Sequence, residues 1–297
     1  MWTGRQSMNL TFRTLASASL ALAMAGCAGT TGTTTASSTP DDPGFGHVHG
    51  LGLNPADGLV YAATHFGVFR LDPSGAERVA DRYQDTMGFT VAGPDRFLGS
   101  GHPDLREGKP PHLGLVESTD RAETWTSVSL EGEVDFHALA AVGPNVYGWD
   151  ATTGVLMHSS DAGATWSTGP VLAVSDLDVD PTDPERLVVA SENGLLESDD
   201  AGATLSPMPG QPPRRLAYIR FSPASTSDQQ LVGVDEEGTV WTDAEGRWTQ
   251  VGSLPGPPEA FAVAADGRLL AATSAGVFIS TDSAASWELL AETAGHG

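Results

Sequence analysis

The stretch SSDAGATW at residues 159–166 decides the fold of this chain, because the sequence repeats its pattern at intervals of about forty residues. Each copy has a serine, an aspartate two residues later, and a bulky apolar residue five residues after the aspartate. The other copies are STDRAETW at 118–125, SDDAGATL at 198–205, STDSAASW at 280–287, and a degraded copy that keeps Asp243 and Trp248. Self-similarity at such a period is typical of a repeat architecture, in which each repeat is one supersecondary unit.

Each repeat has the pattern of four short antiparallel strands. Around the stretch quoted first, apolar residues alternate over 136–142, a Gly-Pro-Asn turn follows, and two further runs cover 146–149 and 155–159. Period-two alternation broken by turn residues predicts a meander. Six such units fit the chain, at roughly 46–83, 84–133, 134–173, 174–213, 214–257 and 258–294. We therefore predict an all-β fold, a six-bladed β-propeller of four-stranded antiparallel blades, in preference to the alternative of seven blades.

The first residues have the features of an export signal. Arg5 and Arg13 precede an apolar stretch at 15–24 that is too short to form a stable membrane span, which predicts a signal peptide. The stretch ends in Met24-Ala25-Gly26-Cys27, and Cys27 is the only cysteine of the chain. This ending resembles the lipobox of bacterial lipoproteins, in which the cysteine is lipidated. The alternative is an incidental cysteine in an ordinary cleaved signal peptide.

Residues 28–44 are rich in Thr, Ser, Gly and Pro, a composition that buries little and predicts a flexible tether. The predicted organisation is thus a signal peptide with lipobox at 1–27, a tether at 28–44 and a propeller at 45–297. We expect an extracytoplasmic protein that is lipid-anchored to the cell membrane of a bacterial envelope.

The chain is acidic, with 15 Lys+Arg against 38 Asp+Glu and a formal net charge of -23. Such a surface repels nucleic acid and anionic lipid headgroups. We expect no nucleic-acid partner, no membrane contact apart from the N-terminal lipid anchor, and a monomer.

The repeated serine–aspartate motif resembles the Asp-box, or bacterial neuraminidase repeat, superfamily of β-propellers, which includes sialidases, sortilin-type receptors and photosystem assembly factors. The resemblance implies that the box aspartates are structural: Asp120, Asp161, Asp200 and Asp282. The residue types support this role, because aspartate accepts hydrogen bonds from turn amides, glycine tolerates positive φ, and tryptophan packs into a blade.

The motif also predicts which loops share a face. In a four-stranded meander, the turn between strands three and four lies on the same face as the turn between strands one and two. The opposite face collects the beginnings of the first strands and the turns between strands two and three, which surround the mouth of the central channel. The first-strand positions are His49, Met87, His137, Ser175, Ala217 and Glu259, preceded two residues earlier in the first three units by His47, Asp85 and Asp135. The second-strand ends are His65, His102, Asp150, Glu192, Asp235 and Ser274.

Five of the eight histidines occupy these mouth positions, which suggests a transition-metal site. The candidate ligands are His47, His49, His65, His102 and His137, with Met87 as a soft ligand and His112 brought in by an insertion at 101–112 that would cover the mouth as a lid. Imidazole suits zinc and copper, and a thioether favours copper. The competing interpretation is that histidines at strand ends bond only to neighbouring loops and that Met87 belongs to the core.

Two other functions remain open. A glycoside hydrolase needs two carboxylates flanking one bond, and the candidates are Asp104, Asp135, Asp150, Glu192 and Asp235. A true sialidase is disfavoured, because Arg70 does not fit the Phe/Tyr-Arg-Ile-Pro motif that sialidases show and Arg214, Arg215 and Arg220 belong to one unit. The third hypothesis is a non-catalytic receptor or assembly scaffold. Its acidic mouth would take a small cationic ligand or a protein partner.

Overall fold

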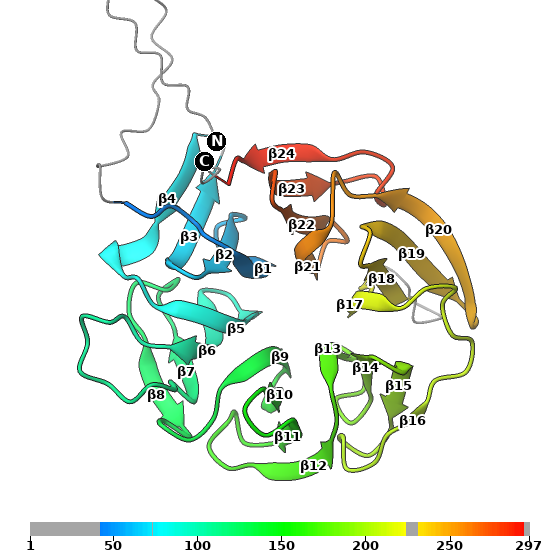
Figure 1. The fold of residues 1–297 in the computed structure, drawn as a ribbon, viewed down its shortest axis with the longest axis horizontal. Coiled ribbons are helices and arrows are strands. Elements are labelled where there is room, and N and C mark those ends of the chain that lie inside the picture. Colours follow the sequence, from blue (N-terminus) through cyan, green and yellow to red (C-terminus); the bar gives the residue numbers. More distant parts are fainter. Residues whose placement is uncertain (1–41, 73, 224–230, 294–297) are drawn as a thin grey trace, which may run out of the picture. The chain divides into compact units, whose positions relative to one another are not determined.

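The computed structural model describes residues 42–72, 74–223 and 231–293. These residues form a six-bladed β-propeller whose blades are four-stranded antiparallel sheets, which confirms the predicted fold class (Figure 1). The chain divides into Met1–Ser37 and Ser38–Gly297, of which the second holds the propeller. The predicted signal peptide, Cys27 and the tether up to residue 41 lie outside the described residues. Among the described residues, no helix has the length and apolar character needed to cross a bilayer.

The first three blades are formed by twelve consecutive strands. Blade one contains β1 (Val48–Leu53), β2 (Val60–Thr64), β3 (Gly67–Asp72) and β4 (Gly75–Arg78), followed by the short helix η1 (Val79–Asp81). Blade two contains β5 (Asp85–Gly93), β6 (Arg96–His102), β7 (Leu115–Ser118) and β8 (Thr126–Ser129). Blade three contains β9 (Phe136–Val142), β10 (Asn145–Asp150), β11 (Val155–Ser159) and β12 (Ser167–Val171).

The last three blades repeat this order. Blade four contains β13 (Val174–Val179), β14 (Leu187–Ser191), β15 (Gly194–Ser198) and β16 (Ser206–Pro207). Blade five contains β17 (Leu216–Phe221), β18 (Leu231–Asp235), β19 (Thr239–Ala244) and β20 (Arg247–Ser253). Blade six contains β21 (Pro258–Val263), β22 (Leu269–Thr273), β23 (Gly276–Ser280) and β24 (Glu288–Ala291).

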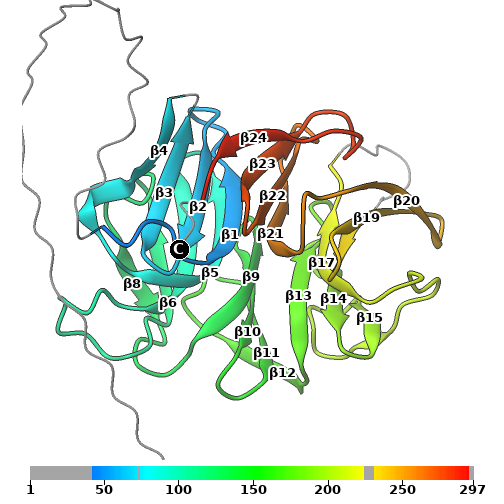
Figure 2. The same cartoon turned by 45° about the horizontal axis from the view of Figure 1, so that its top comes forward.

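The hydrophobic core is divided among the six junctions between neighbouring blades. Each junction holds one cluster of buried apolar side chains. The cluster that closes the ring joins Val48 and Leu51 of blade one to Leu270 and Val277 of blade six. Figure 2 shows the strands of blades one and six next to each other. Because each blade uses its own four strands in chain order, side-chain packing closes the ring without exchange of a strand.

The four repeated box turns share one hydrogen-bond pattern. Ser159 donates its hydroxyl proton to Asp161 at 2.7 Å and accepts the amide of Gly163 at 2.8 Å, while Asp161 accepts the amide of Thr165 at 2.8 Å. Equivalent bonds occur at Asp120, Asp200 and Asp282. Two consecutive residues with positive φ, such as Ala162 and Gly163, make the turn. The carboxylates are therefore engaged by their own turns.

The box turns contact the loops between the first and second strands of their own blades. The amide of Ala162 donates to the carbonyl of Pro144 at 2.8 Å, and the amide of Ala201 donates to that of Glu185 at 2.8 Å. The opposite face is consequently formed by the starts of the first strands and by the turns between the second and third strands. This is the face on which the sequence places the histidines.

Candidate functional site

A β-bulge at the start of every first strand aims one residue toward the central channel. In each blade the pairing of the first and second strands skips one residue, and these residues are His49, Met87, His137, Ser175, Ala217 and Glu259. A bulge leaves its extra residue out of the ladder and redirects the side chain. All of them except Ala217 line a cavity of about 230 Å³ at the channel mouth. The six first-strand positions chosen from the sequence are thus the six bulge positions.

The last paired residue of the second strand caps the following turn in five blades. Thr64 accepts the amide of Phe66 at 3.1 Å, and Asp150 accepts the amide of Thr152 at 3.1 Å. Ser191, Asp235 and Thr273 do the same in blades four, five and six. Asp150 and Asp235 therefore align with Thr64 and lie one residue before the position of His65, which corrects the alignment made from the sequence.

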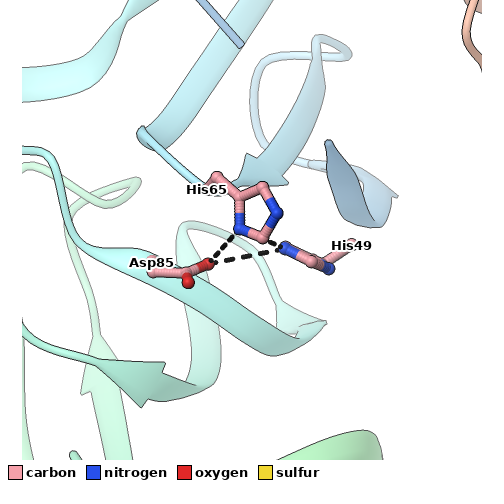
Figure 3. A group of neighbouring side chains, drawn as sticks. All are labelled: His49, His65 and Asp85. Atoms are coloured by element: carbon pink, nitrogen blue, oxygen red, sulfur yellow. Dashed lines mark hydrogen bonds and ion pairs between the residues drawn. The ribbon is translucent and has the colours of Figure 1, made fainter. Parts of the chain in front are cut away.

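Three mouth residues from two blades form a tight group, which we call cluster A: His49, His65 and Asp85 (Figure 3). His49 Nε2 lies 3.0 Å from His65 Nδ1 and 3.4 Å from Asp85 Oδ1, and His65 Nδ1 lies 3.1 Å from the same oxygen. Burial opposes ionisation of Asp85, but hydrogen bonds from both histidines outweigh it and hold its pKa below the ordinary value. Cluster A thus combines an ionised carboxylate with two imidazoles.

Cluster A lies between two cavities. On the channel side, the His47 ring is 4.9 Å from the His49 ring, and His47 Nδ1 lies 3.4 Å from Glu259 Oε2. Burial lowers the pKa of His47 although the carboxylate of Glu259 opposes this shift. On the other side, His65 and Asp85 line a second cavity of about 670 Å³ together with Tyr83. We call this second space the lateral cavity.

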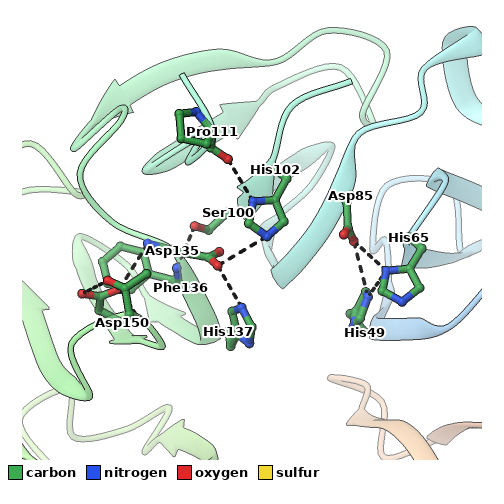
Figure 4. Close-up of polar contacts among 11 residues, drawn as sticks. His49, His65, Asp85, Ser100, His102, Pro111, Asp135, Phe136, His137 and Asp150 are labelled. Carbon is green, nitrogen blue, oxygen red and sulfur yellow. Dashed lines mark hydrogen bonds and ion pairs between the residues drawn. The ribbon is translucent and has the colours of Figure 1, made fainter. Parts of the chain in front are cut away.

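A second group of possible ligands, cluster B, comprises His102, His112 and Asp135. Figure 4 shows His102 and Asp135 of this group together with His137. One nitrogen or oxygen from each residue lies within 4.8 Å of the others. Asp135 Oδ2 lies 3.6 Å from His102 Nε2 and 3.0 Å from the Nε2 atom of His137. The other carboxylate oxygen of Asp135 and the Nδ1 atom of His112 are buried and make no hydrogen bond.

The predicted lid does not cover the channel mouth. The amide of Leu113 donates to the carbonyl of Gly101 at 2.9 Å, so the insertion leaves the blade and returns at the same place. Residues 103–106 of the insertion line the lateral cavity, whereas no described residue of the insertion lines the channel cavity. The insertion therefore forms a wall beside cluster A.

The predicted carboxylate candidates have different environments. Asp104 is held by Arg106 and by the amide of Tyr83, and the hydrogen bonds from Arg106 lower its pKa far below the usual range. Asp150 and Asp235 cap turns, and Glu192 is exposed. Asp135 alone among the five combines a position between histidines with a buried oxygen that has no partner.

The structure thus divides the predicted ligands between two groups. His49 and His65 belong to cluster A, with His47 beside it, and His102 belongs to cluster B, with His137 beside it. Met87 lines the channel cavity between them in the ring. The role of Asp85 in cluster A was missed by the sequence analysis, although Asp85 had been placed at the mouth.

Comparison with known proteins identifies relatives of the fold. No family model matches the chain. A xyloglucanase from Hypocrea jecorina is 28% identical over 178 residues, which are 54% of this chain and 19% of that protein. A solved GH74 enzyme from Niastella koreensis superposes with a TM-score of 0.61 at 17% identity, covering 82% of this chain and 45% of the other. YCF48 from Cyanidioschyzon merolae superposes with a TM-score of 0.50 at 14% identity, covering 83% and 85%.

These similarities place the fold among the propellers found in GH74 glycoside hydrolases and in YCF48. The chain spans less than half of the GH74 enzymes and about a fifth of the xyloglucanase. The fold alone does not select one activity, because the same propeller scaffold carries unrelated functions. The function must therefore be inferred from the side chains at the channel mouth.

Proposed function

We propose that this chain is an extracytoplasmic metal-binding propeller that holds a transition-metal ion, copper or zinc, in cluster A. The supporting observation is the triangle of His49 Nε2, His65 Nδ1 and Asp85 Oδ1, with sides of 3.0, 3.1 and 3.4 Å. Two ligand atoms bound tetrahedrally at about 2.0–2.1 Å from one zinc ion are about 3.3 Å apart. The three atoms are thus already spaced for a single ion.

The chemistry of the group agrees with this assignment. Imidazole nitrogens and a carboxylate oxygen suit zinc and copper(II), and the ionised state of Asp85 supplies the negative charge. The formal net charge of -23 raises the local concentration of cations. Because cluster A borders both the channel cavity and the lateral cavity, a fourth coordination position would be open to water or to an external ligand.

Metal analysis of the full-length chain, purified without a histidine tag, tests this proposal. After incubation with zinc or copper(II) and removal of free ions, we expect bound metal, and one equivalent less of it in His65→Ala and in Asp85→Asn. The matched control is His158→Gln, because His158 bonds Asn145 away from both clusters. Metal at a hundredfold excess over Kd stabilises the native state by about 2.7 kcal/mol, so the melting temperature should rise in the wild type and the control.

Two results would refute the proposal. The first is less than a tenth of an equivalent of any transition metal in the loaded wild type. The second is wild-type metal content in both His65→Ala and Asp85→Asn at the same loading concentration.

Glycoside hydrolysis is the second candidate function, and the similarity to the xyloglucanase over 178 residues favours it. Of the carboxylates predicted from the sequence, Asp135 is the one that combines burial with an oxygen free of hydrogen bonds. Incubation with xyloglucan should then release reducing ends, and Asp135→Asn should abolish the release. If Asp135→Asn and the wild type released reducing ends equally, Asp135 would not be required for the activity.

The location proposed here depends on Cys27. We propose that Cys27 is lipidated and anchors the propeller to the membrane, on the basis of the lipobox-like sequence before it. Labelling of cells with a palmitate analogue should mark the wild type and leave Cys27→Ser unlabelled. A labelled Cys27→Ser chain would contradict the anchor.

A further inference from the structure

Two of the three residues of cluster B, His102 and Asp135, occupy the positions of His65 and Asp85 of cluster A, one blade further around the ring. Three positions are compared in each set: the bulge residue, the second-strand residue that follows the partner of the residue before the bulge, and the residue two positions before the bulge of the next blade. In the first set they are His49, His65 and Asp85, and in the second set they are Met87, His102 and Asp135. The second set keeps the histidine and the aspartate, and it has a methionine in place of the bulge histidine.

The orientation of His102 in cluster B is suited to ligation. Its Nδ1 lies 2.9 Å from the carbonyl oxygen of Pro111, which only accepts hydrogen bonds, so Nδ1 carries the proton. In the neutral ring, Nε2 then presents a lone pair toward Asp135 Oδ2 across 3.6 Å. A backbone carbonyl that fixes the tautomer of a histidine in this way is a common outer-shell contact at metal sites.

Cluster B also contains buried polar atoms without partners. Asp135 is 4% exposed, yet its Oδ1 makes no hydrogen bond, and the same holds for the buried Nδ1 of His112. A buried acceptor without a donor costs free energy, and a cation bound between these groups would remove that cost. Cluster A has no such atoms among its three residues, so the two clusters are recognised by independent observations.

We infer that cluster B is a second transition-metal site, with His102, His112 and Asp135 as its ligands. His137 bonds the same carboxylate at 3.0 Å and would support Asp135 from the channel side. The site shares no ligand with cluster A, so it stands or falls separately from the proposed function.

The second ion would fasten the insertion to the ring. His102 and His112 lie on either side of residues 103–111, and Asp135 directly precedes the first strand of blade three. An ion bound by all three residues joins blade two, the end of the insertion and blade three. The insertion forms one wall of the lateral cavity through Asp104, Leu105 and Arg106, and cluster A borders the same cavity. Occupation of cluster B would therefore fix a wall of the space that leads to cluster A.

Zinc titration of the full-length, tag-free chain tests the second site. We expect two equivalents in the wild type and in His158→Gln, one equivalent in His112→Ala, one in His65→Ala, and none in the double variant. The buried Nδ1 of His112 makes no hydrogen bond that the substitution would break, so the variant should remain folded.

Limited trypsin digestion provides a second readout, because the Arg106–Glu107 bond lies within the insertion and the Arg106 side chain is 55% exposed. Zinc should protect this bond in the wild type and in His65→Ala, and it should give no protection in His112→Ala or His102→Ala. Two equivalents together with zinc-dependent protection in His112→Ala would overturn the inference. The inference would also be overturned if the wild type bound a single equivalent of zinc and His65→Ala bound none. If that single equivalent instead remained in His65→Ala and was lost in His112→Ala, the result would support cluster B and refute cluster A.

Discussion

Blades one to three and blades four to six present the same backbone at the channel mouth but different side chains. The position that supplies Asp85 and Asp135 at the first two junctions is occupied by Ala173, Arg215 and Pro257 in the last three blades. The six bulges and the six meanders are nevertheless shared. The repeat therefore encodes the scaffold, and the departures from the repeat in one half of the ring encode the candidate metal sites.

In the second half of the ring, the carboxylates of Asp176 and Asp178 are bound by groups of the same half. Arg220 on β17 bonds Asp176 on β13, and the amides of Ile219 and Phe221 donate to Asp176 and Asp178, each at 2.8 Å. Burial raises the pKa of Asp178 to about 6 although Arg220 opposes the shift. Clusters A and B of the first half contain no arginine, and their carboxylates, Asp85 and Asp135, face histidines.

Substitution of Arg220, the cation that pairs with Asp176, should have the largest effect on stability. Arg220→Met leaves Asp176 and Asp178 without a counterion, and breaking a buried pair in this way costs about 3 kcal/mol. Burial raises the pKa of both carboxyls in the folded state, so protonation favours the native form. The loss should consequently be smallest below pH 4 and grow as the pH rises through about 6.

Urea unfolding at pH 4 and pH 8 measures this loss. The control is Arg268→Met, which breaks a partly exposed pair with Asp266 and should cost less than about 1 kcal/mol. If the two variants lose equal stability at pH 8, Arg220 does not stabilise the second half by neutralising Asp176 and Asp178. Zinc binding by cluster A should remain unchanged in Arg220→Met.

Introducing the cluster A residue types at the third junction tests whether these positions alone are enough to create a metal site. The third junction has His137 at the bulge but carries Ala151 and Ala173 at the other two positions. The double variant Ala151→His, Ala173→Asp should therefore bind one more equivalent of zinc than the wild type. Ala151→His alone is the control, because it lacks the carboxylate. A folded double variant with the wild-type stoichiometry would show that more than these three positions is required.

Blade one has a histidine at its bulge and blade two has a methionine, and the effect of this difference on metal binding can be tested in blade two. Met87→His places a histidine at the bulge beside His102 and Asp135, as His49 stands beside His65 and Asp85. The added imidazole should strengthen zinc binding by cluster B on the order of tenfold, or about 1.4 kcal/mol. Preference for copper(I) over zinc should fall at the same time, because a thioether is a softer ligand than imidazole. Competition titrations of both metals in His65→Ala and in His65→Ala, Met87→His isolate cluster B. Unchanged zinc affinity would place Met87 outside the site.

The sequence predicted the scaffold and the mouth positions better than it predicted how the histidines group. The box repeats located the blades because each box closes its own turn with local hydrogen bonds, as Asp161 does. Local patterns cannot show that the insertion returns His112 to His102, since this depends on the path of the loop. The single predicted site accordingly became two groups. Asp150 was misaligned because blades one, four and six cap the same turn with a hydroxyl, and this shared capping role was the signal that could have corrected the alignment.

The box turns should show no difference between the two halves. Asp161 lies in blade three and Asp200 in blade four, and hydrogen bonds from Thr165 and Thr204 lower the pKa of both carboxyls to about 2. A lowered folded-state pKa gives stability above the unfolded pKa near 4, and that stability is lost as the pH falls toward 2. Asp161→Asn and Asp200→Asn remove one such titration each, so the decline of melting temperature between pH 4 and pH 2 should become shallower by the same small amount in both. Asp243→Asn is the control, because burial raises the pKa of Asp243. A clear difference between the two box variants would mean that the scaffold itself, as well as the mouth, distinguishes the halves of the ring.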